Sequence, residues 1–185
     1  MSGSIFDEGA VLVPELVTPA EERRLLQRIA GAPWMTDIGR RVQHYGFKYD
    51  YRGSASPVPA APFPRWAEVM ADRLAPWFEA TVPEQCIVNE YVPGQGIGMH
   101  ADHAQFGPVV ASLSLACDWP MRFRPRSVRP YARDGLPGDE VVVLPRRSVL
   151  VLAGDARHHW MHGIDRAAGR GRAVRVSATF RTLAR

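Results

Sequence analysis

The second half of the chain is a series of six short segments, most of them rich in β-branched residues and bounded by Gly, Pro or Asp. They cover residues 85–92, 107–117, 121–125, 140–145, 147–155 and 173–181. Segments of this length and composition predict β-strands, and many such strands at close spacing predict a sandwich or barrel. With 185 residues, the chain is long enough to bury the core of one such domain.

Two helical patterns precede these strands. In residues 18–31, Thr18 and Glu21 form a predicted capping box at the start of the first helix. Residues 64–80 predict a second helix, which Pro76 should break or kink. The predicted apolar side of this second helix consists of Trp66, Val69, Met70 and Leu74. Helices followed by a run of strands indicate an α+β fold with the helices packed on one side of the β-structure.

The composition bounds the class of protein. The chain is 46% hydrophobic and 23% charged, as ordinary globular proteins are. It has no apolar run of about 20 residues and no basic segment at its N-terminus, so we expect neither a membrane span nor a signal peptide. Cys86 and Cys117 are too few for a disulfide framework. We therefore expect two buried thiols and a cytoplasmic protein. A net charge of +4 is compatible with an anionic partner but does not require one.

A glycine-rich stretch, "NEYVPGQGIGMHAD" at residues 89–102, ends on His100 and Asp102. Residues two apart in a strand project to the same face, as two ligands of one metal must. Such a pair alone is weak evidence, but a distant histidine could complete the set. The candidates for it are His158, His159 and His162. Two histidines and one carboxylate leave three adjacent coordination positions open, which is typical of non-haem Fe(II) sites that react with oxygen.

The last predicted strand has two different faces. Arg175, Ser177, Thr179 and Arg181 alternate with apolar residues. One interpretation is an edge strand whose polar side faces water. The other is a strand whose polar side lines a cavity, where the two arginines bind an anion. One large class of Fe(II) oxygenases uses 2-oxoglutarate, and a guanidinium suits its distal carboxylate.

Taken in order, "NEYVPGQGIGMHAD", "WMHGI" and "RVSATFR" resemble the AlkB family of Fe(II)- and 2-oxoglutarate-dependent dioxygenases. The resemblance covers about residues 40–181. It implies a double-stranded β-helix (jelly roll), with Fe2+, 2-oxoglutarate and O2 as cofactor and co-substrates. It also implies that the iron ligands are His100, Asp102 and His162. We expect a single domain over residues 1–185, with the N-terminal helices and a substrate lid in 1–85 and the jelly-roll core in 86–185.

The same resemblance assigns the co-substrate residues. Asn89 and Tyr91 match positions that hydrogen-bond 2-oxoglutarate, and Arg175 matches the position that pairs with its distal carboxylate. Arg181 matches a second arginine near the metal. Ser177 stands where several members have Asn, and its hydroxyl can still donate a hydrogen bond over a shorter reach. The resemblance assigns no ligand role to His158 and His159. His103 is expected either in a surface loop or in contact with a metal ligand, without binding the metal itself.

The segment between the two predicted helices contains basic residues interleaved with aromatic ones. They are Arg40, Arg41, His44, Tyr45, Phe47, Lys48, Tyr49, Tyr51 and Arg52. Such a mixture suits nucleic acid, since rings stack on bases and cations bind phosphates, but ordinary packing of a strand pair is the alternative. The resemblance implies a nucleotide-recognition lid over an iron pocket that receives a flipped base. We expect substrate contacts from Arg40, Arg41, Tyr45, Lys48 and Tyr49.

The expected reaction is oxidative dealkylation of N-alkylated bases in DNA or RNA by a monomeric enzyme. The branch that this chain resembles most contains a tRNA wobble-uridine hydroxylase, so hydroxylation of a modified tRNA base is an alternative. Demethylation of a protein side chain is another, although it needs no basic, aromatic lid. A non-catalytic nucleic-acid-binding domain would not need all three ligands, and a zinc hydrolase would have no use for the paired arginines.

Overall fold

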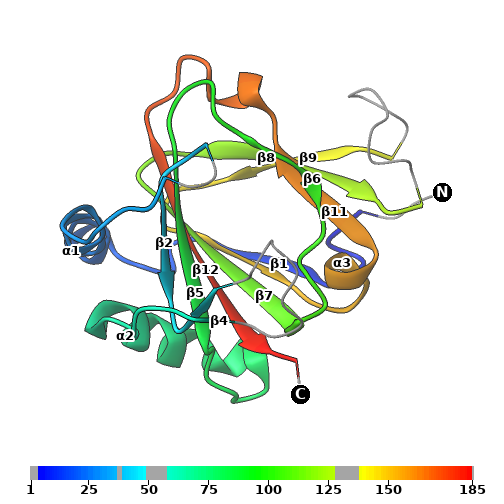
Figure 1. The fold of residues 1–185 in the computed structure, drawn as a ribbon. Helices are drawn as coiled ribbons and strands as arrows, with labels where there is room; N and C mark the ends of the chain where they lie inside the picture. The colour runs from blue at the N-terminus through cyan, green and yellow to red at the C-terminus, as the bar shows by residue number, and fades with distance from the viewer. Residues whose placement is uncertain (1–3, 37–38, 49–57, 128–137, 185) are drawn as a thin grey trace.

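The computed structural model describes residues 4–36, 39–48, 58–127 and 138–184. Two antiparallel sheets face each other (Figure 1). The larger sheet has the strand order β1 (Ala10–Val13), β10 (Val149–Leu152), β7 (Phe106–Leu115), β12 (Arg175–Leu183), β5 (Gln85–Tyr91) and β2 (Val42–Tyr45). The smaller has the order β6 (Ile97–His100), β11 (Trp160–Ile164), β8 (Trp119–Pro125) and β9 (Glu140–Leu144). A separate pair consists of β3 (Phe47–Lys48) and β4 (Val58–Pro59).

The helices α1 (Pro19–Ala30) and α2 (Arg65–Leu74) lie on the outer side of the larger sheet, as Figure 1 shows. A short helix, α3 (Gly154–His158), lies beside β7, β1 and β11. Two 3-10 turns, η1 (Ala75–Phe78) and η2 (Arg166–Gly169), complete the described elements. The predicted α+β class with helices on one side of a β-sandwich is confirmed.

The start of α1 and the end of α2 each have a local cause in the sequence. The Thr18 hydroxyl accepts from the Glu21 N–H at 3.2 Å, and the Glu21 carboxylate accepts from the Thr18 N–H at 2.7 Å, so the predicted capping box is present. Helix α2 gives way to the η1 turn beside Pro76, as expected, because proline cannot donate the next helical hydrogen bond. Ala75, the residue before this proline, keeps a right-handed helical backbone because the chain tightens into a 3-10 turn there.

One predicted member of the apolar face of α2 is wrong. Val69 is 38% exposed, whereas the buried positions are Ala67, Met70, Ala71 and Leu74. These four follow the i, i+3, i+4, i+7 spacing of one helix face, and Val69 lies off it. Ala67 and Ala71 belong to the hydrophobic core on the helix side of the larger sheet.

The larger sheet separates two hydrophobic cores. On the helix side, Val176, Ala178 and Phe180 of β12 pack with α1 and α2. On the other side, a second core packs between part of the two sheets around Trp119 and Phe123 of β8. Burial of both faces explains why β10 is apolar and buried at every position.

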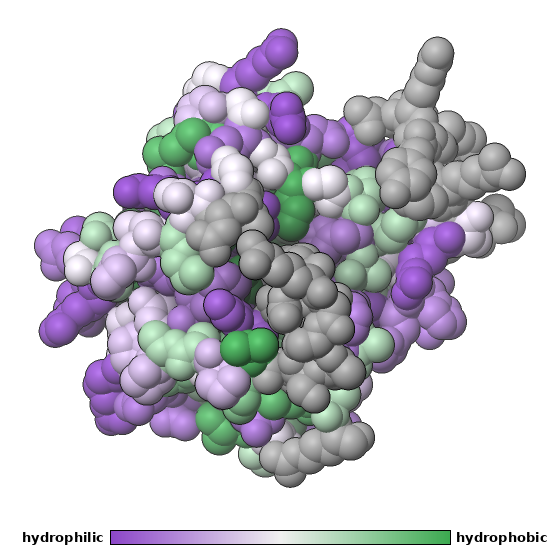
Figure 2. Space-filling view, viewed as in Figure 1, coloured by the Kyte–Doolittle hydropathy of each residue, from purple (hydrophilic) through white to green (hydrophobic). Residues whose placement is uncertain are grey.

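The surface and the cysteines complete the description. On the face seen in Figure 2, hydrophobic residues occur in small groups among hydrophilic ones. Cys86 is fully buried and burial raises the pKa of its thiol, whereas Cys117 is only half-buried, so the expectation of two buried thiols is half wrong. No helix in the described part of the chain is long and apolar enough to cross a membrane.

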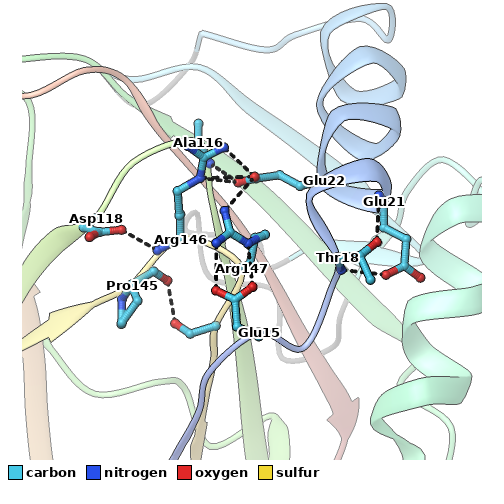
Figure 3. A network of polar contacts seen from close by, with 10 residues as sticks. Glu15, Thr18, Glu21, Glu22, Ala116, Asp118, Pro145, Arg146 and Arg147 are labelled. Atoms are coloured by element: carbon cyan, nitrogen blue, oxygen red, sulfur yellow. Dashed lines mark hydrogen bonds and ion pairs between the residues drawn. The ribbon is translucent and has the colours of Figure 1, made fainter.

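A buried carboxylate joins α1 to two loops of the sandwich (Figure 3). Glu22 accepts from the Ala116 N–H at 2.9 Å and from Arg146 Nη2 at 2.6 Å, and Arg147 Nη1 lies 3.5 Å away. Burial opposes ionisation of Glu22, but the hydrogen bonds from Arg146 and Ala116 outweigh it and hold its pKa below 4.5. The ionised Glu22 therefore ties the first helix to the β7–β8 and β9–β10 connections.

Replacing Glu22 by Gln should lower the free energy of unfolding by about 2 kcal/mol at neutral pH, because charge-assisted hydrogen bonds to a buried carboxylate are lost. Since folding depresses this pKa, the contribution is present above about pH 4.5 and is lost as the pH falls below it. The difference between wild type and Glu22→Gln, measured by urea unfolding, should therefore shrink in acid. As a control, Glu15→Gln removes an exposed partner of Arg147 and should cost much less. Equal losses in the two variants would contradict this role of Glu22.

Candidate active site

A cavity of about 610 Å³ lies between the two sheets. All eight residues expected at the metal and the co-substrate line it: Asn89, Tyr91, His100, Asp102, His162, Arg175, Ser177 and Arg181. Thr179 lines it too, so the whole polar face of β12 points into this space. Because β12 pairs with β5 on one side and β7 on the other, the interpretation as an edge strand is wrong.

Pairing of β6 with β11 brings the two predicted histidine ligands together. His100 and His162 are directly opposite in the register, and their ring centroids are 4.5 Å apart. The chain reaches this arrangement through Gly96, where any side-chain carbon would lie 2.2 Å from the carbonyl oxygen of Ile164. Asp102 follows just after the end of β6, and its Oδ2 lies 3.7 Å from His162 Nε2.

The protonation states of these three side chains are those of metal ligands. Burial lowers the pKa of His100, and burial together with the neighbouring His100 lowers the pKa of His162 to about 3, so both rings are neutral. Burial alone would raise the pKa of Asp102, but Arg181 and the two histidines hold it well below its usual range. Neutral imidazoles and an ionised carboxylate are the forms that bind a divalent ion.

The tautomer of His100 also suits a ligand. Its Nδ1 lies 2.9 Å from the carbonyl oxygen of Gly98. Because a carbonyl oxygen can only accept, Nδ1 carries the proton and Nε2 keeps its lone pair. Metal-binding histidines commonly donate the other ring N–H to a backbone carbonyl in this way.

The chemistry of these three side chains fits a metal ion, although they do not enclose a common metal position among the described residues. In the part of the chain that the structure describes, no three His, Cys, Asp or Glu side chains enclose a common metal position. Asp102 Oδ1 binds Arg181, while the buried Oδ2 has no hydrogen-bond partner among the described residues. A buried carboxylate oxygen without a partner is costly, and a cation bound between Asp102 and the two histidines would satisfy it.

Arg157 holds the segment that carries Asp102. From α3, its Nη1 donates to the Asp102 carbonyl at 3.0 Å and its Nη2 to the His103 carbonyl at 3.0 Å. A third, longer contact of 3.4 Å reaches the carbonyl of Phe106. Arg157 is buried, so these backbone contacts fix the loop between β6 and β7 and with it the position of the carboxylate.

The predicted co-substrate residues lie side by side on two strands. Arg175 is opposite Tyr91 in the register of β12 and β5, and Ser177 is opposite Asn89. The Arg175 side chain is 1% exposed, donates to the Ser114 hydroxyl at 2.9 Å, and lies 5.5 Å from the centre of the Tyr91 ring. Its buried Nε has no hydrogen-bond partner among the described residues.

Arg181 lies at the other end of the β12 face. It contacts Asp102, donates through Nη1 to Gln85 Oε1 at 3.0 Å, and its guanidinium carbon lies 4.7 Å from the centre of the Phe106 ring. This placement beside Asp102 agrees with the expectation of a second arginine near the metal. Six residues of strand separate Arg181 from Arg175, which is roughly 20 Å of extended chain.

The expected lid residues are distributed over three environments. Tyr45 belongs to the hydrophobic core, where its hydroxyl bonds Gln43 and its ring packs edge-on against Trp66, so we correct the expectation that it stacks on a base. Arg41 is held by Glu90 through two contacts of 2.7 and 2.6 Å. Arg40 turns into the cavity.

Gly46 sets the direction of the lid after β2. It has φ +73° and ends the regular alternation of β2, as a bulge at this position would. A side-chain carbon there would lie 1.9 Å from the carbonyl oxygen of Glu84, so only glycine fits. Lys48, in β3, is partly exposed, while Tyr49, Tyr51 and Arg52 lie outside the described residues.

His44 and His103 also line the cavity, whereas His158 and His159 do not. His158 and His159 are exposed at the end of α3, and His103 is exposed in the loop after Asp102, where its Nδ1 accepts from the Gln105 N–H at 3.1 Å. Sequence reasoning overlooked Arg157, Gln85 and Ser114. Of these, only Ser114 stands out in the sequence, as a polar residue in a mostly apolar predicted strand.

The chain matches known proteins over most of its length. The model of the 2OG-Fe(II) oxygenase superfamily matches residues 32–181. A Mus musculus protein named tRNA (carboxymethyluridine(34)-5-O)-methyltransferase ALKBH8 is 31% identical over 84% of this chain and 24% of its own length. An Arabidopsis thaliana protein named Alkylated DNA repair protein ALKBH8 homolog is 33% identical over 84% of this chain and 50% of its own length. The chain thus spans half or less of these two relatives.

A solved structure, that of OsALKBH1, has the same fold, with a TM-score of 0.70 over 94% of this chain and 98% of the other at 17% identity. The predicted AlkB-like jelly roll is therefore confirmed. A Mus musculus protein named Alpha-ketoglutarate-dependent dioxygenase alkB homolog 4 is 33% identical over 95% of this chain and 67% of its own length. On this relative and on the match over residues 32–181, the chain belongs to the 2OG-Fe(II) oxygenase superfamily and to its AlkB family.

Proposed function

We propose that this dioxygenase oxidatively dealkylates N-alkylated bases of DNA or RNA. The observation that carries the proposal is the single cavity in which His100, Asp102 and His162 adjoin the arginine-bearing face of β12. The Arabidopsis relative, named for repair of alkylated DNA, supports a nucleic-acid substrate of this kind.

In the proposed reaction, His100, Asp102 and His162 would hold Fe(II), and Arg175, Tyr91, Asn89 and Ser177 would hold 2-oxoglutarate. Fe(II), 2-oxoglutarate and O2 together would supply the oxidant that hydroxylates a C–H bond, with 2-oxoglutarate converted to succinate and CO2. The protein residues contribute position and charge: Arg175 offers its guanidinium to a carboxylate, and Arg181 fixes the Asp102 carboxylate. Ile87, Val110 and Leu152 line the cavity as well and give part of its wall an apolar surface.

The substrate enters this cavity as a base turned out of its stack. Hydroxylation of the carbon attached to the base nitrogen gives a hemiaminal, which breaks its C–N bond to release the repaired base and an aldehyde. The exposed side of the lid, with Lys48 and Arg41, would contact the phosphates on either side of that base. With Tyr45 in the core, the stacking ring must come from elsewhere in the lid.

The second candidate is hydroxylation of a modified tRNA base, which the name of the mouse relative favours. One experiment separates the two candidates. A panel of N-alkylated DNA and RNA oligonucleotides, bulk tRNA and methylated peptides is incubated with Fe(II) and 2-oxoglutarate and analysed by mass spectrometry. Loss of an alkyl group from an oligonucleotide supports dealkylation, whereas a gain of one oxygen in tRNA supports the second candidate. Demethylation of peptides alone would contradict both.

Asp102→Ala should bring succinate formation below detection and weaken metal binding, because the only carboxylate of the proposed ligand set is lost. Asp102→Glu should fail as well, since the added methylene displaces the carboxylate beyond what metal geometry tolerates. Succinate is measured by mass spectrometry, Mn(II) binding by titration, and folding by circular dichroism. Asp72→Ala removes an exposed carboxylate of α2 and serves as the control. Wild-type turnover in the Asp102→Ala protein would rule out the ligand set.

Arg175→Met keeps the bulk of the buried side chain and removes its charge. Loss of a charge-assisted pair to a buried carboxylate costs about 2–5 kcal/mol, so the KM for 2-oxoglutarate should rise about 30-fold or more. The measurement is uncoupled succinate formation without nucleic acid, together with oligonucleotide affinity, which should stay unchanged. An unaltered KM would exclude Arg175 as the anchor.

Charge reversal at Arg41 and Lys48 together should weaken oligonucleotide binding. It should also make binding less dependent on salt, with the slope of log K against log salt reduced by up to about 1.4 for a single strand. Reversing Arg23 and Arg28, exposed on α1, changes the net charge equally and is the matched control. Fluorescence anisotropy at several salt concentrations tests both pairs. If the two pairs behave alike, the lid is not the nucleic-acid contact.

A further inference from the structure

Arg40 points to the co-substrate end of the cavity rather than to the outside of the lid. It lies just before β2, and its Nε donates to Asn89 Oδ1 at 2.8 Å. Its guanidinium carbon is 5.4 Å from the centre of the Tyr91 ring, and the residue lines the cavity. The sequence suggested a phosphate contact for this arginine, yet its neighbours are two of the predicted 2-oxoglutarate residues.

A second cation occupies the same end. Arg175 lies 5.5 Å from the centre of the same Tyr91 ring and is opposite Tyr91 in the strand register. Two guanidinium groups therefore contact the same aromatic ring. Arg175 is buried without a carboxylate partner among the described residues, which is costly, and an anion bound at this end of the cavity would pair with it.

No carboxylate of the described residues supplies that anion. Arg181 forms an ion pair with Asp102, and Arg41 forms one with Glu90. Neither Arg40 nor Arg175 forms an ion pair within the described part of the chain. The two ends of the cavity thus differ: positive charge is neutralised beside Asp102 and is in excess beside Tyr91. An anionic group bound at the Tyr91 end would meet two cations at once.

The contact with Asn89 adds a second effect. Because the amide oxygen of Asn89 accepts from Arg40, the amide N–H groups point the other way and remain available to donate. Asn89 is buried and lines the cavity, so its donors serve an oxygen inside it. Arg40 therefore supplies a charge and also orients a neighbouring donor.

We propose that Arg40 is a second arginine for the distal carboxylate of 2-oxoglutarate, and that it selects a dicarboxylate over a 2-oxo acid with only one carboxylate. This inference rests on the proposed use of 2-oxoglutarate by this cavity. It moves Arg40 from the substrate contacts, where the sequence suggested it, to the co-substrate contacts.

The test is binding of 2-oxoglutarate to the Mn(II)-loaded protein without oxygen, followed by tryptophan fluorescence. Arg40→Ala should raise the Kd for 2-oxoglutarate by about tenfold or more, because a charge-assisted contact is lost. The Kd for 2-oxopentanoate, which lacks the distal carboxylate, should stay the same, so the preference between the two acids falls. Arg40→Lys keeps the charge and should recover part of the preference. In uncoupled turnover, the loss should appear in KM and not in kcat.

Two references make the outcomes distinct. Arg24→Ala removes an exposed charge of α1 and should change neither Kd. Arg175→Met should raise the Kd for 2-oxoglutarate whether or not Arg40 contacts the co-substrate. If Arg175→Met and Arg40→Ala both leave it unchanged, the proposed co-substrate site itself is wrong. If only Arg40→Ala has no effect, or if it weakens oligonucleotide binding instead, the inference about Arg40 is overturned while the proposed function stands.

Discussion

Burial of both faces of the larger sheet is the constraint on which the rest of the molecule depends. One face must be apolar to receive α1 and α2, and the other must present the polar side chains of the cavity. Strand β12 meets both demands through its two-residue alternation, with Phe180 among the helices and Arg181 beside Asp102. The helices are therefore part of the site's support, because they hold in place the sheet from which the arginines project.

Charge is the second organising element. Arginine side chains hold buried backbone or carboxylate groups at three places. Arg157 donates to the loop after β6, Arg146 binds Glu22, and Arg181 binds Asp102. Arg175 and Arg40 contact neither a carboxylate nor a backbone carbonyl within the described residues; their partners there are a hydroxyl, an amide and an aromatic ring. The role proposed for both is to bind the carboxylate of 2-oxoglutarate.

The parts of the structure with a local cause could be predicted from the sequence. The capping box at Thr18, the alternation of β12 and the histidine–aspartate pair all follow from spacing within a few residues. What failed depends on contacts between distant segments. Tyr45 is as compatible with a lid as with a core until β2 is paired to β5, and that pairing places it beside Trp66. Arg40 and Arg157 acquire their partners 49 and 55 residues away in the sequence, where no periodicity could reveal them.

The alternation of β12 also affects how such a protein can diverge. Within residues 175–181, the odd-numbered positions line the cavity and the even-numbered positions pack on the helix side, so substitutions at one set need not disturb the other. A change such as serine for asparagine at position 177 can therefore be accepted or rejected by selection on chemistry alone. In β12, the positions that line the cavity therefore alternate with the positions that pack against the helices.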